Sequence, residues 1–139
     1  MNTAMAALVQ EYSLTLFVPG YAVPAVLSLP GDGAPIGGVL LVPGSLYSDV
    51  NGDFPAWNVF PHVYAHLARQ MAERGLAVYR FAKLGPGTGC EVTDAPAAAG
   101  IRTWGGRMTI ARTALAAFRA ALAERDVTVP RFVVAGHSE

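Results

Sequence analysis

Cysteine and charge are both scarce in this sequence. Cys90 is the one cysteine among 139 residues, which excludes an internal disulfide framework and a four-cysteine zinc site. Charged residues make up only 14% of the sequence, and ten basic residues balance ten acidic ones. The balance excludes the clustered Lys and Arg of a nucleic-acid-binding surface. A sequence that is 53% hydrophobic also lacks the composition of a disordered chain.

Targeting signals and membrane spans are missing as well. The first ten residues carry no Lys or Arg ahead of their apolar stretch, so they lack the charged start of a signal peptide. No apolar run free of Gly, Pro and charge reaches the length of about 18 residues that a membrane-spanning helix needs. We therefore expect a cytoplasmic protein with no membrane span and no nucleic-acid partner.

Short extended segments alternate with helical ones. Residues 11–18 alternate apolar and polar side chains, and Pro19-Gly20 leads into a second extended run over 23–29, which predicts an antiparallel hairpin at a sheet edge. Continuous apolar runs follow at 38–42, 76–81 and 131–136. Such runs are typical of strands buried on both faces of a parallel sheet.

Helical patterns separate these apolar runs. The first helix is predicted after a cap at Asn58, with Pro61 in its first turn and Gly75 beyond its end. Its buried stripe is predicted to be Phe60, Val63, Leu67 and Met71. The second is predicted to bury Met108, Ala111, Leu115, Phe118 and Leu122. The alanine-rich residues 95–99 are interpreted as a loop. The order β-β-β-α-β-α-β predicts an α/β fold with a mostly parallel sheet and an amino-terminal antiparallel hairpin.

Two long connections, residues 43–59 and 82–103, leave the carboxyl ends of buried strands, where open α/β sheets bind ligands. The last strand leads directly into Gly136-His137-Ser138-Glu139. A strand followed by Gly-x-Ser matches the beginning of the nucleophile elbow, in which a sharp turn lifts the serine hydroxyl above the sheet. Ser138 is therefore a candidate nucleophile, and an ordinary turn serine is the alternative.

Four segments, residues 39–45, 67–75, 78–87 and 133–139, resemble the amino-terminal half of an α/β-hydrolase, most like the esterase and dienelactone-hydrolase-like branch. The resemblance implies that residues 1–139 form the amino-terminal part of one α/β-hydrolase domain, truncated after the fifth strand. It implies Ser138 as nucleophile, with the backbone N–H groups of Ser45 and Glu139 as oxyanion donors and Leu46 as the alternative to Ser45. No cofactor and no metal are implied.

The family's catalytic triad runs serine, acid, histidine, and Ser138 is the penultimate residue here. We therefore expect the acid and the histidine to come from sequence beyond residue 139, in a complementary polypeptide or a longer protein. His62 and His66 are expected on the solvent side of the first helix. Truncation is expected to leave residues 132–134 as an uncovered apolar edge.

The expected function is hydrolysis of a small-molecule carboxylic ester through an acyl-enzyme on Ser138. A serine peptidase of the same fold and a non-catalytic fragment that associates with a complementary chain are the alternatives. Nucleotide binding at residues 85–89 is a third, although the G-x-G-x-G spacing falls one residue short of the dinucleotide motif. Residues 49–53 are interpreted as an Asx-rich turn rather than a calcium loop. Tyr47 and Trp104 are candidates for lining a substrate pocket.

Overall fold

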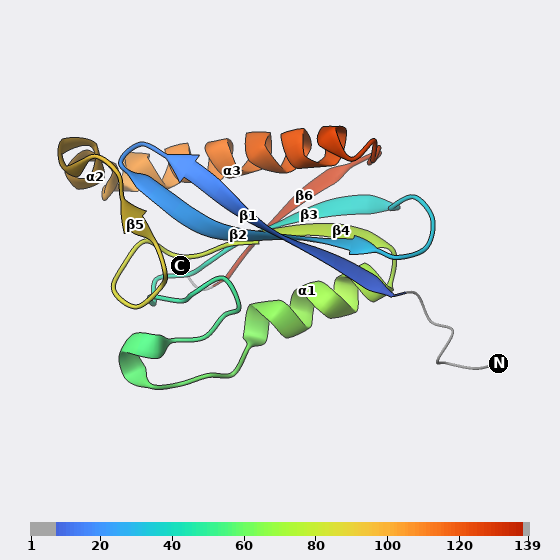
Figure 1. Cartoon of the computed structure of the whole chain (residues 1–139), viewed down its shortest axis with the longest axis horizontal. Coiled ribbons are helices and arrows are strands. Elements are labelled where there is room, and N and C mark those ends of the chain that lie inside the picture. Colours follow the sequence, from blue (N-terminus) through green and yellow to red (C-terminus); the bar gives the residue numbers. More distant parts are fainter. Residues whose placement is uncertain (1–7, 138–139) are drawn as a thin grey trace.

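The computed structural model describes residues 8–137, in which six strands form one sheet (Figure 1). The strands are β1 (Val9–Val18), β2 (Tyr21–Pro30), β3 (Gly37–Val42), β4 (Leu76–Phe81), β5 (Glu91–Val92) and β6 (Phe132–Gly136). They lie in the order β1-β2-β4-β3-β6, and β5 pairs with β2. The predicted hairpin at a sheet edge is confirmed, because β1 is an outer strand paired only with β2 among the described residues.

The sheet is mixed, and the prediction of a mostly parallel sheet is wrong. β3 pairs in parallel with β4 and β6. β2 is antiparallel to each of its three neighbours, β1, β4 and β5. The reason is that the second strand of the edge hairpin also pairs with β4 and β5, so antiparallel pairings outnumber parallel ones.

Helices cover both faces of the sheet (Figure 1). Helix α1 (Val63–Glu73) lies on one face, and helix α3 (Trp104–Glu124) lies on the other. On the α3 side, Phe118 stacks on Tyr79 with ring centroids 5.5 Å apart, and both residues are buried. On the α1 side, Ala68 packs among Val39 and Val78. The result is a three-layer α/β arrangement with β3 and β4 buried in the middle.

Helix α1 buries a different face from the one predicted. Its buried residues are Tyr64, Ala68 and Ala72, whereas Val63 and Leu67 of the predicted stripe are exposed. Phe60 is also exposed and lies before the helix, which begins after His62 rather than Asn58. Small alanine side chains let the helix approach the sheet closely, so the alanine face packs inward and the larger aliphatic residues flank it.

The second predicted helix is confirmed in part. Phe118 and Leu122 are buried on α3, and Leu115 packs against the same cluster, but Met108 is exposed. The interpretation of residues 95–99 as a loop is wrong, because Ala95–Ile101 form helix α2. The Asp94 carboxylate caps that helix by accepting a hydrogen bond from the backbone N–H of Ala97 at 3.2 Å. A short 3-10 helix, η2, spans Pro55–Trp57 and ends at Asn58.

Strand β6 forms the other margin of the sheet among the described residues. Its side chains Val133 and Val134 are 59% and 56% exposed, so the third apolar run is not buried on both faces as β3 and β4 are. Of residues 132–134, which were expected to form an uncovered apolar edge, only Val133 and Val134 are exposed, because Phe132 is partly buried and packs against the core. Over the part of the chain that the structure describes, no helix combines the length and apolar character needed to cross a membrane.

Candidate active site

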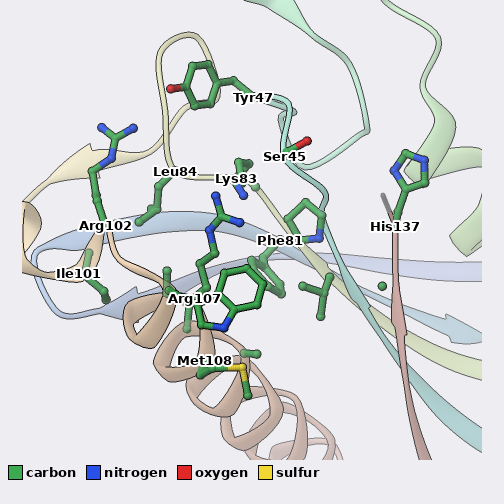
Figure 2. A pocket seen from close by; sticks show the side chains of 17 residues that line it. Ser45, Tyr47, Phe81, Lys83, Leu84, Ile101, Arg102, Arg107, Met108 and His137 are labelled. Atoms are coloured by element: carbon green, nitrogen blue, oxygen red, sulfur yellow. The ribbon is translucent and has the colours of Figure 1, made fainter. Parts of the chain in front are cut away.

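The two long connections open on one cavity of about 560 Å³ (Figure 2). It lies where β3, β4 and β6 end, as expected for an α/β sheet. Its walls come from the segments that follow β3 and β4, from α2 and α3, and from the end of β6; residues on these walls include Ser45, Tyr47, Lys83, Leu84, Ile101, Arg102, Trp104, Arg107, Met108, Gly136 and His137. The predicted positions of Tyr47 and Trp104 at a pocket are therefore confirmed.

The loop that follows β3 presents Ser45 to this cavity. The backbone N–H of Gly44 donates to the Tyr64 hydroxyl, with the two atoms 3.4 Å apart. Within residues 8–137, the backbone N–H of Ser45 donates no hydrogen bond. An oxyanion donor needs a backbone N–H that is not already engaged. In this loop Ser45 and its alternative Leu46 both meet that condition among the described residues, whereas Gly44 does not.

The other side of the site is the end of β6. The candidate nucleophile Ser138 and the candidate oxyanion donor Glu139 lie outside the described residues. The residue before them, His137, donates its backbone N–H to the carbonyl oxygen of Val42 at 3.2 Å. Val42 is the last residue of β3, and the loop that carries Ser45 starts directly after it. The structure therefore places His137, the residue before Ser138, next to the start of the loop that carries Ser45.

Tyr64 contacts two segments that border the cavity, and the predicted helix stripe did not include it. Its side chain is 5% exposed, and its hydroxyl contacts both Gly44 and His137. The predicted stripe on α1 counted only Phe60, Val63, Leu67 and Met71. The four-residue spacing Tyr64-Ala68-Ala72 is the signal that identifies the buried face.

Comparison with solved structures identifies the fold. No protein-family model matches the chain, and no curated protein matches it. A PEG-bound cold-adapted esterase from an Arctic intertidal metagenomic library is 26% identical, with a TM-score of 0.55 and coverage of 94% of this chain and 51% of that chain. A mutant of the esterase Est22 is 15% identical, with a TM-score of 0.59 and coverage of 96% and 36%. A dienelactone hydrolase-like promiscuous phosphotriesterase from metagenomic libraries is 16% identical, with a TM-score of 0.54 and coverage of 92% and 48%.

The chain has an α/β-hydrolase fold. The resemblance to esterases and dienelactone-hydrolase-like proteins is confirmed at the level of the fold. The chain spans about half or less of the length of these three solved structures.

Three cations line the cavity of this α/β-hydrolase fold: Lys83, Arg102 and Arg107 (Figure 2). Burial, together with the positive charges of Arg107 and Arg102, lowers the pKa of Lys83 from 10.5 to about 8. A lysine with that pKa is protonated at neutral pH and loses its charge under mildly alkaline conditions. The charge of the cavity wall therefore changes within a pH range that is easily reached in an assay.

The histidines of helix α1 do not line the cavity. His62 and His66 are exposed, as expected. His62 nevertheless has a partner, because its Nδ1 lies 2.6 Å from Oδ2 of Asp53, a residue that is itself buried. Asp49 Oδ1 accepts the backbone N–H groups of Asn51 and Asp53 at 2.9 and 3.0 Å, which confirms the predicted Asx-rich turn. In the described part of the chain, no group of three or more potential ligands could hold a metal ion.

The glycine-rich loop at residues 85–89 contains an internal hydrogen bond. The Thr88 hydroxyl donates to the carbonyl oxygen of Gly85 at 2.9 Å, and the chain then enters β5 rather than a helix. A dinucleotide loop leads directly into a helix whose N-terminus faces the phosphates. Burial raises the pKa of the nearby Cys90 thiol, so this cysteine is not activated as a thiolate.

Proposed function

We propose that this chain supplies the nucleophile side of a serine hydrolase that cleaves small-molecule carboxylic esters. Ser138 attacks the ester carbonyl carbon and forms an acyl-enzyme, and the alcohol departs with a proton delivered by the catalytic histidine. Water then releases the acid. The observation that supports this most directly is the cavity shared by Ser45, Gly136 and His137, in a fold that resembles esterases.

The backbone N–H groups of Ser45 and Glu139 stabilise the negative charge that develops on the carbonyl oxygen. Removal of one such donor typically costs about 3–4 kcal/mol of transition-state stabilisation. Within residues 8–137, the N–H of Ser45 has no competing acceptor, and Ser45 lies on the cavity wall.

The acid and the histidine of the triad are proposed to come from sequence beyond residue 139, carried by a complementary polypeptide or by a longer protein. A serine hydroxyl is a weak nucleophile without an adjacent base. Among the described strands β6 pairs only with β3, so the other side of its backbone offers an edge to which a further strand can pair.

The experiment is active-site labelling with a fluorophosphonate in the protein that carries this chain, followed by peptide mapping. Ser138 is the expected site of modification, and Ser138→Ala abolishes labelling. Ser45→Ala is the matched control: it removes a hydroxyl from the same cavity but keeps the backbone N–H, so labelling persists. Ser45→Pro removes the N–H and suppresses labelling in a protein that still unfolds cooperatively. Labelling that survives Ser138→Ala refutes the proposal.

A non-catalytic role as an associating subunit is the second candidate, and the exposed apolar edge of β6 favours it. Complete absence of labelling in every assembly of this chain supports that role. A serine peptidase of the same fold differs from an esterase by substrate class. Turnover of p-nitrophenyl acyl esters without turnover of aminoacyl anilides identifies the esterase.

A further inference from the structure

We propose that Tyr64 is a positioning residue, which ties the loop carrying the oxyanion donor to the segment leading into the nucleophile. This inference rests on the function proposed above. Tyr64 lies on helix α1, and neither of the loops that it joins belongs to that helix. Its role is to hold the loop after β3 and the end of β6 at a fixed distance from each other.

The contacts of the phenol hydroxyl carry the inference. The hydroxyl accepts the backbone N–H of Gly44 at 3.4 Å, and it lies 2.8 Å from Nδ1 of His137. The two rings also meet edge to face, with centroids 5.7 Å apart and an interplanar angle of 80°. Because a tyrosine hydroxyl has one proton and two acceptor lone pairs, it can accept from Gly44 and still bond His137. One atom therefore connects a residue adjacent to Ser45 with a residue adjacent to Ser138.

The backbone of Tyr64 is held in place by its neighbours. The carbonyl oxygen of Asn51 accepts the backbone N–H groups of Tyr64 and Ala65 at 3.1 and 3.0 Å, in the first turn of α1. Gly52 packs so closely that a Cβ added there would clash with the backbone nitrogen of Tyr64. Arg80 in turn donates to Asn51 Oδ1 at 3.3 Å. The hydroxyl thus extends from a buried residue whose backbone is hydrogen-bonded and closely packed, as a positioning group requires.

Such a link affects the transition state more than substrate binding. The N–H of Ser45 and the hydroxyl of Ser138 must converge on one reacting carbonyl group, and a small misplacement lowers the rate steeply. Burial raises the pKa of Tyr64 above its usual value, so the phenol keeps its proton throughout the neutral range. Loss of the hydroxyl is therefore expected to reduce kcat and to leave KM nearly unchanged.

Tyr64→Phe is the first test, since it deletes the hydroxyl and keeps the ring. We expect the rate of Ser138 labelling by a neutral fluorophosphonate, and kcat for a p-nitrophenyl ester, to fall about tenfold. Tyr79→Phe is the matched control, because Tyr79 is another buried tyrosine that stacks on Phe118 of α3, on the opposite face of the sheet. This control is expected to label at the wild-type rate.

A second readout does not depend on activity. The ring nitrogens of His137 report their hydrogen bonds through their 15N chemical shifts, and Tyr64→Phe is expected to shift the Nδ1 signal. His137→Asn places an amide near the position of Nδ1 and retains most of the labelling rate, whereas His137→Phe lowers it to the level of Tyr64→Phe. This pair tests the same hydrogen bond from the other side if Tyr64→Phe does not fold.

The outcomes separate this inference from the proposed function. If wild-type protein is not labelled at Ser138, the proposed function fails, and the 15N shift still decides whether Tyr64 bonds His137. If the wild type is labelled and Tyr64→Phe is labelled equally fast with an unchanged Nδ1 signal, the positioning role is refuted while the proposed function stands. A tenfold loss with an altered Nδ1 signal supports both.

Discussion

Replacing Arg80 by Met removes a buried guanidinium that joins three parts of the fold. Arg80 lies on β4 with its side chain 3% exposed. It donates to the Glu11 carboxylate and the Ser28 hydroxyl, both at 3.1 Å, and to the carbonyl oxygen of Val50 at 2.9 Å. A fourth bond reaches Asn51 Oδ1 at 3.3 Å. Met preserves most of the apolar stem but makes none of these bonds.

The expected loss is about 3 kcal/mol of unfolding free energy. Removing one partner of a buried ion pair typically costs 3–5 kcal/mol, because the remaining charge is left without compensation. The Glu11 side chain is 37% exposed, so water can solvate the abandoned carboxylate, and the loss falls at the lower end of that range. The buried Ser28 hydroxyl keeps its bond to Glu11 at 2.7 Å, which also limits the damage.

Urea unfolding followed by circular dichroism at pH 7 measures the effect. Arg74→Met is the control, because Arg74 is exposed and, among the described residues, its side chain donates only to the carbonyl oxygen of Gln70. The loss for this variant is expected to stay below about 0.5 kcal/mol. A loss below about 1 kcal/mol for Arg80→Met, with an unchanged m-value, would refute the reasoning.

The dependence of the unfolding free energy on pH in the acidic range provides a second test of the hydrogen bonds around Arg80. Partial burial raises the pKa of Glu11, but hydrogen bonds from Ser28 and Arg80, and the charge of Arg80, outweigh that effect and bring the pKa below 4.5. The carboxylate therefore stabilises the fold above pH 4.5, and this contribution is lost as the pH falls through the lowered pKa. Glu11→Gln is expected to flatten that part of the pH profile.

Three further predictions concern the cavity wall and the opposite face of the sheet. Because the pKa of Lys83 is about 8 in the fold and 10.5 in the unfolded chain, the unfolded state binds more protons between those values, and stability rises with pH there. Arg107→Gln should diminish that rise in pH-dependent urea unfolding; an identical slope in both proteins would contradict the assigned cause. Phe118→Ala removes a buried ring and should cost about 3–5 kcal/mol in the same assay; a loss under 1 kcal/mol would show that the ring is not part of the core. The Thr103 hydroxyl accepts the backbone N–H of Gly106 at 3.0 Å, so Thr103→Ala should cost about 1 kcal/mol, whereas Thr103→Ser should cost little; equal losses would argue against the cap.

Local patterns in the sequence were sufficient to locate most strands. The predicted ranges 11–18, 23–29, 38–42, 76–81 and 131–136 each fall within a strand or within one residue of it. The reason is that alternation and continuous apolar runs are properties of a few neighbouring residues. The Asx-rich turn at Asp49 was accessible for the same reason, since its bonds reach only two and four residues along the chain.

The spacing of aliphatic residues did not predict which face of a helix is buried where the distance between helix and sheet decides it. Helix α1 turns Ala68 and Ala72 to the sheet instead of Leu67, because a small side chain allows close approach to β4 and β2. The local cap at Asp94 was also overlooked, although its carboxylate starts α2. Whether β2 would pair with β4, and so make the sheet mixed, depended on contacts between residues fifty or more positions apart.

The sequence by itself determined the chemistry available at this site: a strand that leads into Gly136-His137-Ser138, and a Gly44-Ser45 loop after an earlier strand. Only the tertiary structure decided which groups meet there. It brought Lys83, Arg102 and Arg107 to one cavity and placed the Tyr64 hydroxyl between Gly44 and His137. Tyr64 and His137 are separated by 73 positions in the chain, and a contact at that range arises from how the helix packs on the sheet rather than from any local pattern.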